Sequence, residues 1–101
     1  MSRVIADGLS KRVSQTTTTD TSKTLVPGER CFVTAAGQTI TLPTSPAVNT
    51  SVSIGVGAFK DTVVDRNGEN IMGLAENMTI DKENYVVTLI YVDSTQGWRI
   101  E

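Results

Sequence analysis

Alternation of apolar and polar residues runs through most of the chain beyond residue 24. In residues 38–42, Ile40 and Leu42 share one face of an extended chain and two threonines share the other, and residues 51–56 follow the same period of two. This period is typical of a β-strand with one face on a core and the other in solvent. No segment repeats its apolar residues with helical spacing, so we predict an all-β chain.

Turn signals separate the candidate strands. Pro27-Gly28 has the chemistry of a type II turn, because proline fixes φ and glycine accepts a positive φ, and Asn67-Gly68 is the strongest hairpin signal in the chain. The spacing predicts a small antiparallel β-sandwich or a jelly-roll-like barrel. The expected strands cover residues 24–26, 31–35, 38–42, 51–56, 62–64, 70–72, 78–80, 85–92 and 97–100.

The run at residues 85–92 is apolar on nearly both faces. Such a strand is central in its sheet and covered on two sides, once by the core of its own domain and a second time by that domain or by another subunit. We therefore assign Val86, Leu89 and Tyr91 to the core or to an oligomer contact. Trp98, the single tryptophan, is expected to cap the core.

Residues 1–24 are predicted to form an extended N-terminal arm, and residues 25–101 the β-sandwich domain. The Thr-rich run at residues 14–22 has nothing apolar to bury, so it is either disordered or an arm that adds to another chain. The arm carries four cations against two aspartates, a net charge of +2, whereas residues 25–101 carry five cations and nine carboxylates, a net charge of −4. We expect the cations to contact a partner, and these are Arg3, Lys11, Arg12 and Lys23.

Length and composition restrict the partners. A chain of 101 residues is one small domain that buries a limited share of its surface and is expected to need partner subunits. The four cations of the arm are dispersed and have no aromatic residue between them, which argues against nucleic acid. No apolar run reaches the roughly 18 residues of a membrane span, so we expect no membrane partner and synthesis in the cytoplasm.

Catalytic chemistry is poorly represented in the sequence. The chain has no histidine and a single cysteine, Cys31, which removes Ser-His-Asp catalysis and histidine-based zinc sites. Residues 65–70 have alternating oxygen ligands but lack the spacing and the final glutamate of a calcium loop. We therefore predict no enzyme activity, no metal or other cofactor and no small-molecule substrate, and we interpret Cys31 as a small buried hydrophobic residue.

Several short patterns occur in a fixed order between residues 25 and 101. They are QTITLP at 38–43, VSI at 52–54, VVDRNGENI at 63–71, VTLIY at 87–91 and GWRI at 97–100. In this order they resemble a module of tail-fibre and other virion structural proteins of tailed bacteriophages. The resemblance implies a non-enzymatic β module, commonly trimeric, that serves as a scaffold on the particle.

The functional prediction follows from this resemblance. We expect a capsid decoration (cement) protein of the virion, which forms a homotrimer and fastens to the major capsid protein through its N-terminal arm. One alternative is a tail-fibre, baseplate or neck component of the same particle. A second alternative, from another class, is a carbohydrate-binding module in which Trp98 stacks on a sugar ring.

Overall fold

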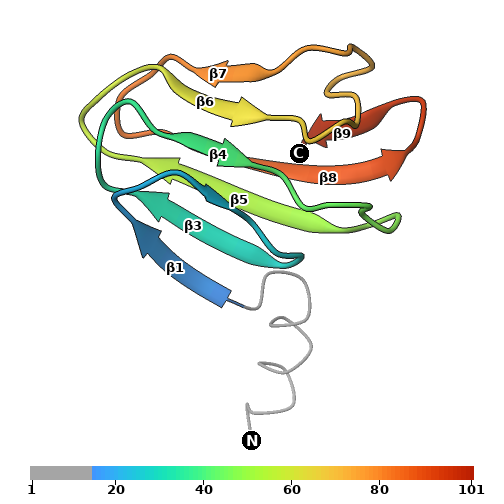
Figure 1. Ribbon diagram of the computed structural model, residues 1–101, viewed down its shortest axis with the longest axis horizontal. Coiled ribbons are helices and arrows are strands. Elements are labelled where there is room, and N and C mark those ends of the chain that lie inside the picture. The colour runs from blue at the N-terminus through green and yellow to red at the C-terminus, as the bar shows by residue number, and fades with distance from the viewer. Residues whose placement is uncertain (1–14) are drawn as a thin grey trace, which may run out of the picture.

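The computed structural model describes residues 15–101, which form nine strands in two mixed sheets and no helix (Figure 1). The expected all-β class is confirmed. The five-stranded sheet has the order β1-β3-β5-β8-β9, with β1 at Gln15–Thr19, β3 at Glu29–Val33, β5 at Ser51–Val56, β8 at Val86–Asp93 and β9 at Gly97–Ile100. The four-stranded sheet has the order β2-β4-β6-β7, with β2 at Lys23–Thr24, β4 at Thr39–Thr41, β6 at Thr62–Asp65 and β7 at Met78–Ile80.

The first six strands alternate between the two sheets, so each strand pairs with the strand two places along the chain. These pairs, β1–β3, β3–β5, β2–β4 and β4–β6, are parallel. Antiparallel pairs come with the last three strands, in β5–β8, β8–β9 and β6–β7. The prediction of an antiparallel fold is therefore wrong for the first six strands. Neither sheet closes on itself, so the jelly-roll-like barrel is not formed by the described residues.

The turns form as their sequences predict, but they lead to different partners. At Pro27-Gly28 the N–H of Glu29 donates to the carbonyl of Val26 at 3.2 Å, and Gly28 has a φ of +81°. This turn carries the chain from β2 in one sheet to β3 in the other, so it closes no hairpin. The Asn67-Gly68 turn also forms, with φ values of +50° and +85°, and it opens the long connection between β6 and β7.

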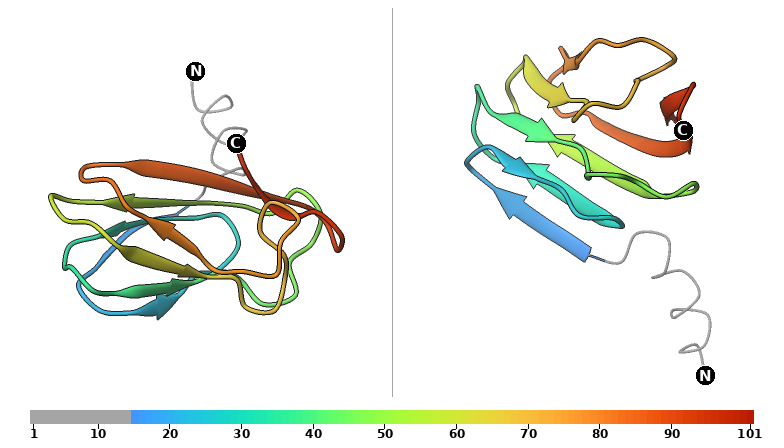
Figure 2. Two further views of the ribbon diagram at one scale, coloured as in Figure 1. Left: turned by 90° about the horizontal axis from the view of Figure 1, so that it is seen from above. Right: turned by 45° about the vertical axis from the view of Figure 1, so that its right-hand side comes forward.

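The Thr-rich run forms β1, which pairs in parallel with β3 of the same chain. Two strands of the expected arm thus belong to the sheets, β1 at one edge of the five-stranded sheet and β2 at one edge of the other (Figure 1 and Figure 2). The rest of the expected arm lies outside the described residues. The expected strand at 70–72 is replaced by a turn, in which Ile71 makes isolated bridges to Leu74 and to Trp98.

Buried side chains from both sheets form one hydrophobic cluster. The period of two places Ile40, Ile54 and Leu89 inward, and each of them is fully buried. Tyr91 and Trp98 pair across β8 and β9, with ring centroids 5.5 Å apart in an edge-to-face arrangement. We call the face of each sheet that carries this cluster the inner face and the opposite face the outer face. Residues 15–101 contain no helix able to cross a membrane.

Candidate functional site

The outer face of the five-stranded sheet carries an apolar patch, made by Phe32, Gly55 and Val86. The register of three neighbouring strands sets these residues side by side, because Phe32 of β3 is the partner of Gly55 in β5 and Gly55 is the partner of Val86 in β8. The Phe32 side chain is 41% exposed and that of Val86 is 60% exposed. We refer to these three residues as the outer patch.

Gly55 allows the two larger side chains of the outer patch to approach each other. A Cβ built on Gly55 would lie 2.9 Å from Cδ1 of Phe32 and 3.3 Å from Cγ2 of Val86. The absence of a side chain at position 55 therefore lets the ring of Phe32 lie over the strand toward Val86. The result is a continuous apolar surface across β3, β5 and β8, of the kind that marks contacts between proteins.

Polar residues border the outer patch. The next row of the register contains Arg30, Ser53 and Thr88, and the hydroxyls of Ser53 and Thr88 are hydrogen-bonded at 2.8 Å. A third row is mixed, because it contains the polar residues Ser51 and Arg99 with the apolar Ile90 between them. An apolar centre with a polar and basic border is the usual composition of a protein interface.

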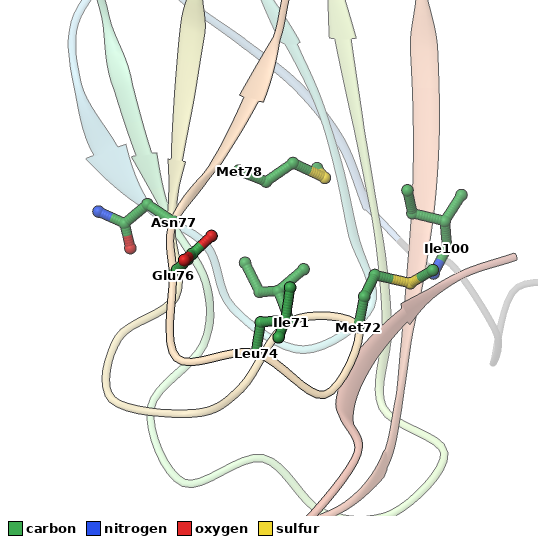
Figure 3. Close-up of a pocket in the computed structure, with 7 residues that line it drawn as sticks. All are labelled: Ile71, Met72, Leu74, Glu76, Asn77, Met78 and Ile100. Carbon is green, nitrogen blue, oxygen red and sulfur yellow. The ribbon is translucent and has the colours of Figure 1, made fainter.

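A second feature is an apolar hollow of about 270 Å³ between the β6–β7 connection and the end of β9 (Figure 3). Glu76 and Asn77 lie on one side of it, and Met72 and Ile100 lie on the other. Most of its wall is aliphatic or thioether carbon, which suits an apolar group better than a charged one. The lining residues are Ile71, Met72, Leu74, Glu76, Asn77, Met78 and Ile100.

The wall of this hollow is a tight turn that is fastened to β9. The N–H of Met72 donates to the carbonyl of Trp98 at 2.7 Å, and the N–H of Trp98 donates to the carbonyl of Asn70 at 2.8 Å. Met72 has a φ of +54°, an uncommon value for a residue with a side chain, and these hydrogen bonds hold it there. The turn therefore covers the backbone of β9 at this edge of the five-stranded sheet.

A polar cluster closes the end of the core next to β1 and β2. The carboxylate of Glu29 is buried, and it accepts hydrogen bonds from the Lys23 ammonium at 2.5 Å and from the Thr17 hydroxyl at 2.6 Å through one oxygen. The backbone N–H of Val26 donates to its other oxygen at 2.9 Å. Burial disfavours the charged carboxylate, but these three hydrogen bonds outweigh burial and lower the pKa of Glu29.

The cations predicted to contact a partner have separate outcomes. Lys23 lies in β2, and its ammonium forms an ion pair with Glu29 of the same chain. The hydrogen bond to Glu29 raises the pKa of Lys23, so the ammonium is held charged in this position. Arg3, Lys11 and Arg12 lie outside the described residues. Contact between these cations and a capsid stays a prediction.

The four residues assigned to the core or to an oligomer contact divide into two groups. Leu89, Tyr91 and Trp98 point inward and belong to the hydrophobic cluster. Val86 points outward and belongs to the outer patch. Phe32 was not among the residues expected at a contact, although the alternation in Cys31-Phe32-Val33 places it on the face opposite two inward residues.

The position of Trp98 bears on the carbohydrate-binding alternative. Its indole has no exposed surface, and its Nε1 finds no hydrogen-bond partner among the described residues. A buried ring cannot stack on a sugar, so the alternative that depends on Trp98 loses its binding residue. Residues 15–101 also bring together no cluster of three histidine, cysteine, aspartate or glutamate side chains suited to a metal ion.

Comparison with known proteins gives a structural similarity and no sequence match. No protein-family model matches the chain, and no curated protein matches its sequence. A chain in a solved structure described as "Structure of a chaperone-substrate complex" is similar over 82% of this chain, with a TM-score of 0.56 and 18% sequence identity. The similarity spans 14% of that chain, so the matched region is a small part of that much longer polypeptide. At this level of identity the likeness concerns the fold alone.

Proposed function

We propose that this chain is a structural protein of a tailed-bacteriophage particle, and that it decorates the capsid. The resemblance of residues 25–101 to virion structural modules suggests the particle. The outer patch is the observation that supports a role in assembly, because Phe32 and Val86 expose apolar surface on the face of the sheet that does not hold the core.

In this proposal the two sheets form a sandwich, and copies of the chain meet through the outer patch. Phe32 and Val86 of one copy would pack against the patches of its neighbours, and the border with Arg30 would stay in contact with water. The homotrimer that the resemblance implies is the assembly we propose. Many copies on a shell multiply weak individual contacts by avidity.

Attachment to the shell is assigned to the N-terminal cations Arg3, Lys11 and Arg12. Lys23 is left out of this group because its ammonium is engaged with Glu29. The proposed partners are therefore other copies of this chain and the major capsid protein, and the proposed location is the virion. A tail component is the alternative within the same particle.

The assembly step is tested with a pair of substitutions at equally exposed valines. Val86 and Val48 are both 60% exposed, so aspartate at either position leaves the core unchanged. We expect wild-type protein and Val48→Asp to sediment as trimers and Val86→Asp to sediment as smaller species, in analytical ultracentrifugation. A monomeric wild type, or a Val86→Asp variant that keeps the full assembly, would contradict the proposed contact.

The particle is tested by quantifying the chain in purified virions. A decoration protein occupies the many repeated positions of the shell, so its copy number should approach that of the major capsid protein. A small fixed copy number located at the tail would favour the tail alternative. Absence of the chain from purified particles would overturn the proposal as a whole.

A further inference from the structure

The four edges of the two sheets differ in how they are protected. At the β9 edge the turn from Asn70 to Leu74 covers the backbone. β2 and β7 are short, with two and three residues. β1 has five residues, QTTTT, with no charge and no proline, and no described residue pairs with its outer side (Figure 2). Edges are usually protected by charge, proline, shortness or a cover, and within residues 15–101 β1 has none of these protections.

The hydrogen bonds of β1 identify the backbone groups that face outward. The N–H of Gln15 donates to Gly28 at 3.3 Å, and the carbonyl of Thr19 accepts from Thr34 at 2.8 Å, so residues 15 and 19 face β3. Successive residues of a strand face opposite sides, so Thr17 also faces β3 and Thr16 and Thr18 face away from it. The open edge therefore presents the N–H and C=O groups of Thr16 and Thr18.

We propose that a second copy of this chain pairs with this edge, β1 against β1, about a two-fold axis through Thr17. This antiparallel register sets Thr16 of each copy opposite Thr18 of the other. The four outward N–H groups then donate to the four outward C=O groups, which gives two hydrogen bonds at each Thr16–Thr18 pair. The inference concerns contact between copies and stands apart from the proposed virion role.

The side chains of β1 favour a second copy over an unrelated strand. Thr16 and Thr18 are exposed on the outer face, where Thr–Thr pairs across antiparallel strands are favourable and no like charges meet. Thr17 points to the inner face, where its hydroxyl is engaged with Glu29. Two identical edges also match in length and twist, so each contact is made twice.

The polar cluster at Lys23 and Glu29 restricts the contact to the strand edge. It closes this end of the core, so a partner meets backbone groups and threonine side chains and gains little apolar burial. A contact of this size is weak, and its population rises with protein concentration. Sedimentation should accordingly show a concentration-dependent pairing.

Proline substitutions on two edge strands test the pairing. In Thr18→Pro the lost N–H points away from β3, so the ladder within the chain is kept. Thr79→Pro is the matched control on β7. The carbonyl of Ile80 accepts a hydrogen bond from the N–H of Asp61, so Ile80 faces β6. Because successive residues face opposite sides of a strand, the N–H of Thr79 points away from the sheet. By symmetry Thr18→Pro removes two of the four hydrogen bonds, and we expect an association constant lower by about tenfold to a hundredfold. Thr79→Pro should associate as the wild type does.

The measurement is made in the Val86→Asp background, which removes the assembly proposed above. Sedimentation at increasing concentration gives the association constant, and hydrogen exchange gives the protection of the Thr16 and Thr18 amides. We expect both amides to become protected as concentration rises. If Thr18→Pro affects folding, Thr16→Lys/Thr18→Lys is compared with Thr79→Lys/Thr95→Lys, since the first pair sets lysine opposite lysine across the axis.

Three results would overturn the inference. They are a monomer at every concentration, equal association of Thr18→Pro and Thr79→Pro, and amides at Thr16 and Thr18 that are protected regardless of concentration. The last result would mean that the same chain or another protein covers the edge. Failure of the virion proposal is separate, because it shows as loss of the Val86-dependent assembly or absence from particles.

Discussion

Gly97 lies against the backbone of Asn70 so closely that a Cβ on Gly97 would stand 1.9 Å from the Asn70 carbonyl oxygen. The same oxygen accepts the N–H of Trp98 at 2.8 Å, and Gly97 has a φ of +70°. Two structural features therefore require glycine in the GWRI pattern: the close approach of the Asn70 backbone and the left-handed conformation of the backbone at position 97. It allows the β6–β7 connection to lie on β9 beside the buried Trp98.

Substitution of Gly97 by alanine is predicted to be strongly destabilising. The methyl group would collide with backbone, which cannot move aside without breaking the hydrogen bonds of Trp98. Strain at a positive φ and overpacking together should lower the free energy of unfolding by about 2–4 kcal/mol. Urea denaturation followed by tryptophan fluorescence measures this loss.

Gly68→Ala is the control for the backbone effect alone. Gly68 has a φ of +85° and no atom within 4 Å of an added Cβ. Its substitution should cost about 1 kcal/mol from backbone strain. Equal losses for the two variants would show that the approach to Asn70 does not matter.

The ion pair of Lys23 and Glu29 predicts a stability plateau bounded at both ends of the pH scale. The pKa of Glu29 is lowered from its ordinary value of 4.5, so the contribution of Glu29 is complete above that value and is lost as the pH falls through the folded-state pKa. The pKa of Lys23 is raised from 10.5, so its contribution is complete below that value and is lost as the pH rises through the folded-state pKa.

Replacing Glu29 by glutamine should weaken the acid end of this plateau. At neutral pH the variant loses the charged hydrogen bonds from Lys23 and Thr17, at a cost of about 1–3 kcal/mol. The difference from the wild type should shrink as the pH falls below 4.5, since the wild-type carboxyl is then increasingly protonated. Urea unfolding across pH checks this, with the exposed Glu83→Gln as control. A difference that is constant with pH would contradict the prediction.

Gly55→Ala should affect association more than stability. The new methyl would lie 2.9 Å from a ring carbon of Phe32, and the exposed ring can move away at a cost below about 1 kcal/mol. The movement changes the shape of the outer patch. We expect weaker assembly in ultracentrifugation with nearly unchanged urea unfolding, whereas an unchanged assembly would mean that the patch is not the contact.

Cys31 is predicted to be unreactive in the folded protein. Its thiol is fully buried, and burial raises its pKa above the ordinary value, so little thiolate is accessible to a reagent. Labelling should require unfolding and should be about 10³-fold slower than in urea, or slower still, for a domain of ordinary stability. A disulfide reagent followed by absorbance gives both rates. Rapid labelling without urea would show that β3 opens locally.

Strand positions could be predicted closely where alternation and turn signals agree. The expected strands at Ser51–Val56, Met78–Ile80 and Gly97–Ile100 coincide with β5, β7 and β9. Strand pairing could not be predicted, because a half-buried strand alternates in the same way in parallel and antiparallel sheets. Turn chemistry specifies a reversal of the chain, but it leaves open whether the next strand lies beside the last one or across the core.

The candidate surfaces were predictable in part. Val86 stood out as an apolar residue on the second face of an apolar strand, and it is exposed. The Thr-rich run was expected to be disordered or to add to another chain, because threonines give it no apolar face. Its pairing within the chain was missed: β1 is held by a ladder to β3 and by the hydrogen bond from the Thr17 hydroxyl to the Glu29 carboxylate. Such contacts depend on residues more than ten positions away, which a local pattern does not reveal.

The alternation of strands between the sheets has a consequence for synthesis on the ribosome. β1, β3 and β5 emerge before β8 and β9, and each parallel pair must wait for a whole strand of the opposite sheet to be made in between. β8, which joins β5 to β9, leaves the exit tunnel only after β6 and β7 of the opposite sheet. The nascent chain therefore carries an unfinished five-stranded sheet until β8 and β9 have been made, and protection from aggregation during translation becomes part of what this topology requires.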